Sequence, residues 1–366
     1  MKISIRGIGV VGGFGCGLKA LEDALLTRAD FAGKVTMDSS EGEIEVPALL
    51  ADTSPLVQYV EKRALRRTDH YIRMGLLGTF KALEDADMLG ATRGRTGIIV
   101  ATGYGATCNT FDFQHSVLNA ADPCGSPTKF SNSVHNAAAS YISIMLNEMG
   151  PTLSVSHFDM SVPSAFLTAV QWLQQDRVDT VLVGGVDEYC KVLGYYWHCR
   201  YGNRRGAGQP LATAEMHHTI IGEGACFFVL QKQTTPACPY GVIDDVCMTG
   251  FRNGPIGLPQ DAIYFLGADG YSECETLYPG VIPRQARTAV YTPLYGGLPV
   301  GMAFDLAIAG LSHRRETLFK SFDGPVVANA EINRIDRQFR HGRDRICCLK
   351  LGAGGFSGWI TISGTE

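Results

Sequence analysis

The sequence lacks the features that mark several large classes of protein. None of its apolar runs is both uncharged and long enough to span a bilayer, so we expect no membrane insertion. The 32 Lys and Arg residues nearly balance the 36 Asp and Glu residues, and a net charge of −4 offers no strong field for nucleic acid. No CxxC pair occurs among the 11 cysteines, which argues against a zinc knuckle or a thioredoxin-type dithiol.

The cysteines point to a reducing compartment. Met1–Val11 lacks the length and the flanks of a secretory signal, so we expect a cytoplasmic protein with reduced thiols. Most of these thiols are then small core residues, and one of them is a candidate nucleophile. Adjacent His217 and His218 cannot easily chelate one ion, and Cys190 and Cys199 flank a segment rich in Tyr and Trp, so we expect neither a metal nor another cofactor.

The pattern of what is present indicates an α/β protein. The 366 residues are 45% apolar, which suits two domains or one large duplicated one. Short β-rich runs alternate with helical patterns, and the proline-containing segment 231–239 is the best candidate boundary. We therefore expect two halves, residues 1–232 and 233–366. The expected strands and helices include Ile3–Val11, Leu18–Leu26, Arg63–Leu89, Thr96–Ala101, Asn136–Glu148, Ala225–Leu230, Val242–Gly250, Ala262–Gly267, Gly301–Gly310, Ile346–Leu351 and Trp359–Ile362, with irregular structure at Asp30–Thr53 and Pro123–Ser133.

The clearest unit runs from Gly150 to Glu188. Strand Thr152–Phe158 turns sharply at Asp159 into helix Ser161–Gln174, and strand Thr180–Gly184 follows, which predicts a parallel crossover. A turn of this kind exposes its residue at a helix N-terminus, where partial positive charge activates a thiol or hydroxyl. The turn at Asp159 is therefore the candidate reactive site.

A second motif offers a different interpretation. Gly7-Ile-Gly9-Val-Val-Gly12 matches the glycine fingerprint of dinucleotide-binding folds, directly after a strand. The glycines continue through Gly17, so the next helix begins too late to receive a phosphate. A tight structural turn is the better interpretation, and a dinucleotide-dependent oxidoreductase remains a distant alternative.

Several motifs in order resemble the β-ketoacyl-acyl-carrier-protein synthases, which have the thiolase fold. They are the opening Ser4–Gly15, the helix Arg66–Ala86, the loop Phe130–Ala138, the segment Gly150–Glu188, the strand Gly222–Leu230 and the turn Gly352–Gly355. The resemblance implies two similar halves, each with a five-stranded mixed sheet, in a five-layer αβαβα arrangement. It also implies a dimer through the N-terminal half and an acyl carrier protein as partner.

The departures from the family pattern are as informative as the matches. The resemblance places the family's nucleophilic Cys on Asp159, its first His on Asp269, its second His on Gly297, its Lys near Thr292 and its gating Phe on Ala353. No cysteine lies between Cys124 and Cys190, and no histidine lies between His218 and His313. We therefore expect no intact catalytic set.

Two functions follow from this resemblance. The first is a non-condensing, ketosynthase-like subunit, or chain-length factor, that pairs with an active ketosynthase (or with a second copy of itself) in a type II polyketide, aryl-polyene or fatty-acid-type pathway. The second is an active synthase or acyltransferase with an unconventional centre at His157, Asp159 and Ser161, since His157 lies two residues before Asp159 and is expected to bond to it.

The acyl tunnel and the dimer interface are also implied by the resemblance. Phe111 and Phe113 fall where the family bounds its tunnel, although plain core aromatics would show the same pattern. The loop Phe130–His135 is expected to cross the interface and to shape the partner's tunnel. The candidate tunnel and interface residues are Phe111, Phe113, Phe130, Asn132, Ser133, His135, His157 and Ala353.

Overall fold

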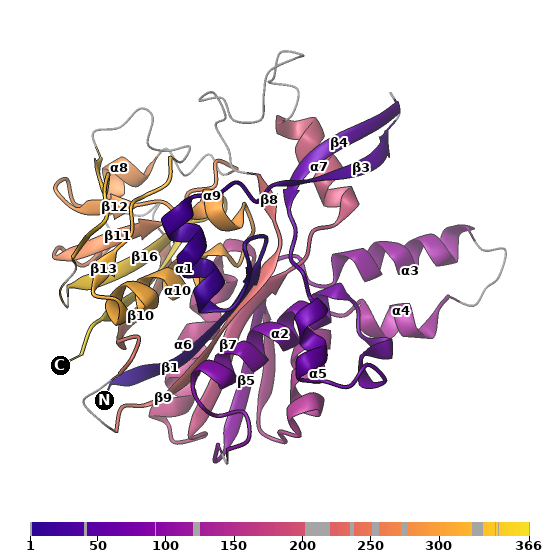
Figure 1. Ribbon diagram of the computed structural model, residues 1–366, viewed down its shortest axis with the longest axis horizontal. Coiled ribbons are helices and arrows are strands. Elements are labelled where there is room, and N and C mark those ends of the chain that lie inside the picture. The colour runs from indigo at the N-terminus through magenta and orange to yellow at the C-terminus, as the bar shows by residue number, and fades with distance from the viewer. Residues whose placement is uncertain are drawn as a thin grey trace.

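A twelve-stranded mixed sheet runs through the part of the protein that the computed structural model describes (Figure 1). The described residues are 2–39, 42–91, 93–119, 125–201, 220–234, 238–250, 256–271, 277–323, 332–340, 342 and 344–365. The order of the strands is β14-β12-β11-β16-β17-β10-β1-β9-β7-β5-β6, and β2 (Gly15–Cys16) pairs with β1.

The two halves of this sheet repeat one pattern. Neighbours in the N-terminal half are antiparallel twice and then parallel twice, in the order β1 (Ile3–Gly12), β9 (Gly224–Lys232), β7 (Thr180–Asp187), β5 (Thr96–Thr102) and β6 (Thr152–Ser156). The same sequence of pairings occurs in β10 (Val242–Gly250), β17 (Phe356–Ser363), β16 (Arg345–Leu351), β11 (Ala262–Leu266) and β12 (Arg287–Ala289). The chain is therefore an internal duplication.

The halves join where β1 meets β10. Ile3 and Ser4 pair with Ile243 and Val242, so two five-stranded sheets become continuous at one edge. The short strand β14 (Asn333–Arg334) extends the C-terminal half by one. Two smaller sheets contain β13 (Thr317–Leu318) with β15 (Phe339–Arg340), and β3 (Gly33–Ser39) with β4 (Gly42–Leu49) and β8 (Ile221–Gly222).

Helices build three layers around the two sheets. The helices are α1 (Leu18–Thr27), α2 (His70–Asp85), α3 (Thr107–Asn119), α4 (Pro127–Asn132), α5 (Ala137–Leu146), α6 (Ser161–Gln174), α7 (Lys191–Tyr201), α8 (Tyr278–Val281), α9 (Thr292–Tyr295) and α10 (Gly301–Arg314). One buried cluster contains residues of α2 and α5, the largest contains α6 and α10 between the sheets, and a third contains Tyr278 of α8. The expected five-layer, thiolase-like arrangement is thus confirmed. Among the described helices, none has the length and apolar character needed to cross a bilayer.

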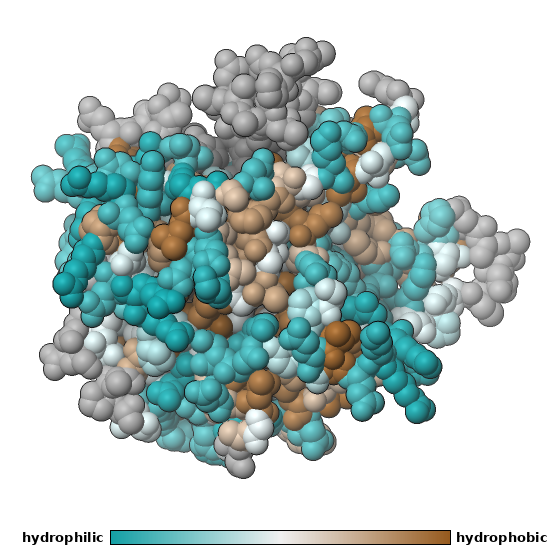
Figure 2. Space-filling view, in the orientation of Figure 1, coloured by the Kyte–Doolittle hydropathy of each residue, from teal (hydrophilic) through white to brown (hydrophobic). Residues whose placement is uncertain are grey.

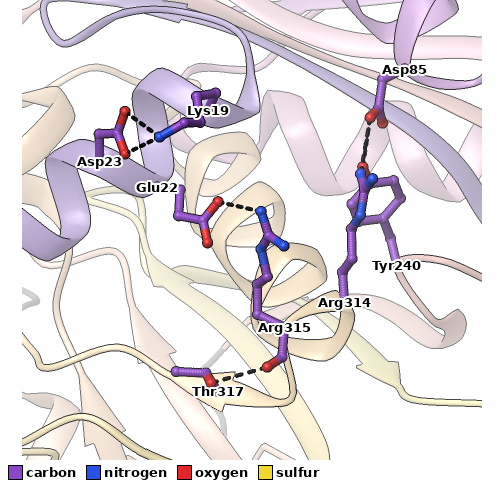
Figure 3. Close-up of polar contacts among 8 residues, drawn as sticks. All are labelled: Lys19, Glu22, Asp23, Asp85, Tyr240, Arg314, Arg315 and Thr317. Carbon is purple, nitrogen blue, oxygen red and sulfur yellow. Dashed lines mark hydrogen bonds and ion pairs between the residues drawn. The ribbon is translucent and has the colours of Figure 1, made fainter.

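Ion pairs attach α10 of the second half to the first half (Figure 3). Arg314 Nη1 lies 3.1 Å from Asp85 Oδ1 at the end of α2, and Asp85 Oδ2 accepts the backbone N–H of Ile8 at 2.9 Å. Tyr240 donates to the same carboxylate at 2.7 Å, and Arg315 reaches Glu22 of α1 at 2.6 Å. The C-terminal end of α10 is therefore held by charge as well as by packing.

Polar side chains cover much of the face in Figure 2, with apolar side chains near its middle.

Three segments differ from the sequence expectations. Asp30–Thr53, expected to be irregular, contains the antiparallel hairpin β3–β4. The helix expected from Arg63 begins at His70, because the Asp69 side chain caps α2 by accepting the Ile72 amide at 2.8 Å. Part of the segment Pro123–Ser133, expected to be irregular, is helical, in α4.

The early glycines serve packing. A Cβ on Gly9 would lie 2.1 Å from the carbonyl oxygen of Gly78, and one on Gly7 would lie 2.4 Å from that of Ala82. Strand β1 therefore approaches α2 more closely than any side chain allows. Gly15 and Gly17, with φ of 109° and 84°, form the turn that leads into α1. These glycines lie within a strand and a turn, which supports the structural interpretation over dinucleotide binding.

Replacement of Gly9 by Ala tests this contact. The added methyl group forces β1 and α2 apart, and we expect a loss of about 1–3 kcal/mol in the free energy of unfolding, measured by urea denaturation. Gly90→Ala is the matched control, because a Cβ there meets nothing within 4 Å, and we expect a change within about 0.5 kcal/mol. Equal stability of the two variants would contradict the close approach.

Candidate functional site

The chain turns abruptly after β6. Phe158 adopts a φ of 45°, rare for a residue with a side chain, and a single 3-10 turn over Phe158–Met160 leads directly into α6. The buried Ser161 hydroxyl holds the turn, since it accepts the His157 amide at 2.8 Å and lies 2.9 Å from the Thr102 carbonyl oxygen. Asp159 is thereby presented to a cavity and not to the sheet.

This cavity of about 400 Å³ lies where loops from both halves meet. Five positions singled out in the sequence line it together: His157, Asp159, Asp269, Gly297 and Ala353. The fold brings them together because the turn after β6, the loop after β11 and the β16–β17 turn all open on one side. The other lining residues are Tyr104, Phe158, Met160, Trp197, Tyr271, Leu298, Pro299, Lys350, Gly352, Gly354 and Phe356.

A buried lysine occupies the base of the site. Lys350 Nζ lies 3.1 Å from Asp269 Oδ2, 3.8 Å from Asp159 Oδ1, and donates to the Gly267 carbonyl oxygen at 2.8 Å. The side chain of Lys350 is 5% exposed, that of Asp269 10% and that of Asp159 25%. One cation therefore joins the turn after β6 in the first half to the loop after β11 in the second half.

The electrostatics follow from this geometry. Burial raises the pKa of Asp159 above its ordinary value, and neighbouring Asp269 acts in the same direction. Lys350 and the backbone amide of Ala353 oppose this rise in pKa by stabilising the carboxylate. Two carboxylates and one ammonium give the base of the cavity a negative charge when all three groups are ionised.

The second-half loops are held firmly. Asp269 Oδ1 accepts the Tyr271 amide at 3.1 Å, and buried Thr292 donates through its hydroxyl to the Ala268 carbonyl oxygen. Thr292 is outside the cavity lining. Thr292, which the resemblance sets near the family's Lys position, therefore stabilises the loop that carries Asp269.

The candidate unconventional centre is arranged differently from the expectation. The His157 ring lies 3.4 Å from Ser164 Oγ through Nδ1 and packs edge-on against Phe356, with ring centroids 6.0 Å apart. Asp159 pairs with Lys350, so the expected His157–Asp159 bond is wrong. The backbone amide of Ala353, in the β16–β17 turn, also stabilises the Asp159 carboxylate.

Six of the expected tunnel and interface residues form a separate group on α3, α4 and the turn after α4. Phe113 and Phe130 are in ring contact, with centroids 5.3 Å apart, and Phe130 is 58% exposed. Asn132 is buried and donates to the Arg67 carbonyl oxygen at 2.8 Å. The set Phe111, Phe113, Phe130, Asn132, Ser133 and His135 contributes nothing to the lining of the cavity described above.

Lys350 was missed by sequence reasoning. A signal was present, because it is the single charged residue within the buried stretch Ile346–Leu351, directly before a glycine-rich turn. Charged side chains are almost never fully buried without a partner, so such a lysine predicts buried carboxylates. No group of three potential metal ligands occurs among the described residues, and His217 and His218 lie outside them.

Comparisons with known proteins agree with this fold. The model of the family "Beta-ketoacyl synthase, N-terminal domain" matches residues 2–235. The 3-oxoacyl-[acyl-carrier-protein] synthase 2 of Rhizobium meliloti (strain 1021) is 25% identical over 253 residues, which are 63% of this chain and 59% of that protein's length.

Solved structures are similar over the whole chain. The ishigamide ketosynthase/chain length factor has a TM-score of 0.80 at 15% identity, covering 100% of this chain and 99% of the other. A β-ketoacyl synthase from Burkholderia phymatum STM815 also scores 0.80, at 13% identity and full coverage of both chains. A type II polyketide ketosynthase in complex with its acyl-carrier protein scores 0.77 at 12% identity, covering 100% and 99%.

Replacement of Lys350 by Met tests the buried cation. It leaves two carboxylates without their ammonium, and we expect a loss of about 3–5 kcal/mol in the free energy of unfolding near pH 7. The loss should shrink as the pH falls toward about 4, because a carboxyl whose folded-state pKa is raised stabilises the fold below its unfolded pKa and loses that contribution as the pH rises.

Two controls accompany this measurement by urea denaturation. Lys19→Met removes an exposed i,i+4 pair with Asp23, and we expect a change of about 0.5 kcal/mol or less. The triple variant Lys350→Met, Asp159→Asn, Asp269→Asn should recover most of the lost stability. A Lys350→Met protein as stable as wild type at every pH would contradict the assigned role.

Proposed function

This chain belongs to the β-ketoacyl synthase family, and from that premise we propose that it is a non-condensing, ketosynthase-like subunit. It pairs with an active ketosynthase and shapes that partner's acyl tunnel in a type II polyketide, aryl-polyene or fatty-acid-type pathway. Its two halves, residues 1–232 and 233–366, act as one body in the cytoplasm, and an acyl carrier protein delivers chains to the pair.

The observation that carries this proposal is the composition of the cavity. Condensation by a thioester route needs a thiolate to hold the acyl chain and donors to stabilise the enolate oxygen. The resemblance to the family puts Asp159 and Asp269 at two of the positions concerned and Gly297 at a third, and all three line the cavity. A carboxylate is a poor acyl acceptor from a thioester, because the mixed anhydride is less stable than its source. Lys350 pairs with both carboxylates, so these groups serve as a structural ion cluster.

The alternative, an active synthase centred on His157, Asp159 and Ser161, has weaker support. The Ser161 hydroxyl is buried and engaged with backbone groups of the turn. Asp159 lies against Lys350, and His157 lies against Ser164. The three side chains therefore do not form a chain of hydrogen bonds that would activate a nucleophile.

The edge of the first half supports the proposed pairing. Strand β6 is the last strand of the sheet, so one side of its backbone is open to another chain. Apolar side chains are exposed beside it, with Ile144 at 68%, Met149 at 93% and Leu153 at 37%. An exposed strand edge with apolar neighbours favours a protein partner, and the resemblance to ketosynthases favours a subunit of the same fold.

Intact-mass measurement after incubation with acyl- and malonyl-acyl carrier protein tests the missing nucleophile. We expect no acyl adduct on the wild-type chain. Asp159→Cys is the matched control, since it places a thiol in the turn after β6, beside Lys350. The neighbouring ammonium lowers the pKa of this thiol, and we expect the variant to be acylated. A stable adduct on any wild-type side chain would favour the active-enzyme alternative.

Co-expression with an active ketosynthase subunit encoded nearby tests the partner. We expect a heterodimer by size-exclusion chromatography with light scattering, and Ile144→Glu should weaken it about tenfold or more, or about 1.4 kcal/mol. Leu26→Glu, at a 51% exposed site on α1, should leave the affinity unchanged. A chain that forms homodimers only, and condenses malonyl units alone, would refute the proposal.

A further inference from the structure

Two cysteines outside the cavity come together from distant parts of the chain. Cys108 is the second residue of α3, and Cys190 directly precedes α7. Cys108 Sγ lies 3.3 Å from the carbonyl oxygen of Tyr189, the residue before Cys190, and each of the two thiols shifts the pKa of the other. Both are free cysteines, so the fold presents a reduced thiol pair at the starts of two helices.

Buried carboxylates fix the backbone on both sides of this pair. Glu188 Oε1 accepts the amide of Cys108 at 2.8 Å, and Glu223 Oε2 accepts the amide of Tyr189 at 2.9 Å. Each of these glutamates is 3% exposed. The sulfur atoms are thus held near one another by interactions that do not depend on a bond between them.

The two thiols differ in acidity. The Cys108 thiol and the amides of Val192 and Leu193, in the first turn of α7, lower the pKa of Cys190 to about 6. The pKa of Cys108 is raised by the neighbouring Cys190, by burial and by Glu188. A thiolate beside a protonated thiol is the arrangement that oxidants attack first.

The other buried cysteines among the described residues lack this arrangement. Burial raises the pKa of Cys347 to about 12 and also raises the pKa values of Cys226 and Cys348. Cys347 and Cys348 are neighbours on strand β16, where successive side chains point to opposite faces. Cys199 is exposed on α7 without a described thiol partner, which makes it a useful internal reference.

We propose that Cys108 and Cys190 are a redox-responsive pair that closes into a disulfide when hydrogen peroxide is the oxidant. The Cys190 thiolate attacks one peroxide oxygen, and the O–O bond breaks. Hydroxide departs, and Cys190 becomes a sulfenic acid. The Cys108 sulfur then attacks the Cys190 sulfur, the S–O bond breaks, and the oxygen leaves as water with the Cys108 proton. Two thiols supply the two electrons that reduce the peroxide.

The disulfide joins helix α3 to helix α7. Helix α3 carries Phe111 and Phe113, and α7 carries Trp197, which lines the cavity. A small oxidant suits the pair, since Cys190 is 3% exposed and Cys108 is only partly buried. The sulfurs need to approach to about 2.05 Å, so the two helix starts must adjust as the bond forms. This inference does not depend on the proposed subunit role.

Peptide mapping of the folded full-length chain tests the pair. The protein is treated with hydrogen peroxide, denatured, and its remaining thiols are alkylated with N-ethylmaleimide before digestion and mass spectrometry. We expect a cross-linked peptide joining Cys108 to Cys190 that dithiothreitol cleaves. Alkylation of both cysteines after treatment, with oxidation confined to Cys199, would overturn the proposal.

Variants separate the two chemical steps. In Cys108→Ser the reaction should stop at a Cys190 sulfenic acid, which dimedone traps, while Cys199→Ser should form the disulfide as wild type does. The proposed order would be overturned if dimedone did not label Cys190 in a Cys108→Ser variant whose circular dichroism spectrum matches that of the wild type. The wild-type mapping decides the existence of the bond even where a variant fails to fold.

Discussion

A single buried ammonium connects the two halves of this protein at the site where their loops meet. Lys350 comes from β16 of the second half, Asp269 from the loop after β11, and Asp159 from the elbow after β6 of the first half. Charges with so little exposure are costly to desolvate, so each depends on the others for compensation. The cluster therefore holds the loops of the two halves together at the cavity, while α10 is held at its far end by Asp85 and Glu22.

The duplicated topology explains why such a cluster can form. Each half has parallel strands, β5 with β6 and β11 with β16, and the loops after β6, β11 and β16 meet at one cavity. In a ketosynthase-type fold that convergence assembles a reactive thiol and its helpers. In this chain the same scaffold assembles two carboxylates and an amine. Family membership and the proposed non-condensing role are thus compatible, since the layers set the geometry and a few side chains set the reaction.

Much of the fold was predictable from pattern alone. The helix Ser161–Gln174 and the strand Val242–Gly250 have the predicted bounds, because apolar periodicity and flanking turn residues agree there. The β3–β4 hairpin was missed since its strands are mostly exposed and polar, and the start of α2 was misplaced because Asp69 caps it from within an apparently continuous helical pattern.

The sequence by itself determined the family, the layered α/β architecture and the residues, Asp159 and Asp269 among them, that the resemblance sets against the family's Cys and His positions, since these depend on local pattern and on residue identity. Tertiary structure alone decided which of these groups contact one another. Asp159, Asp269 and Lys350 are separated by 81 to 191 positions, and nothing local records that they share one charge cluster. The same holds for Cys108 and Cys190, whose contact arises from two helix starts brought together by the sheet. Pairing between distant residues is a property of packing, and only the folded chain displays it.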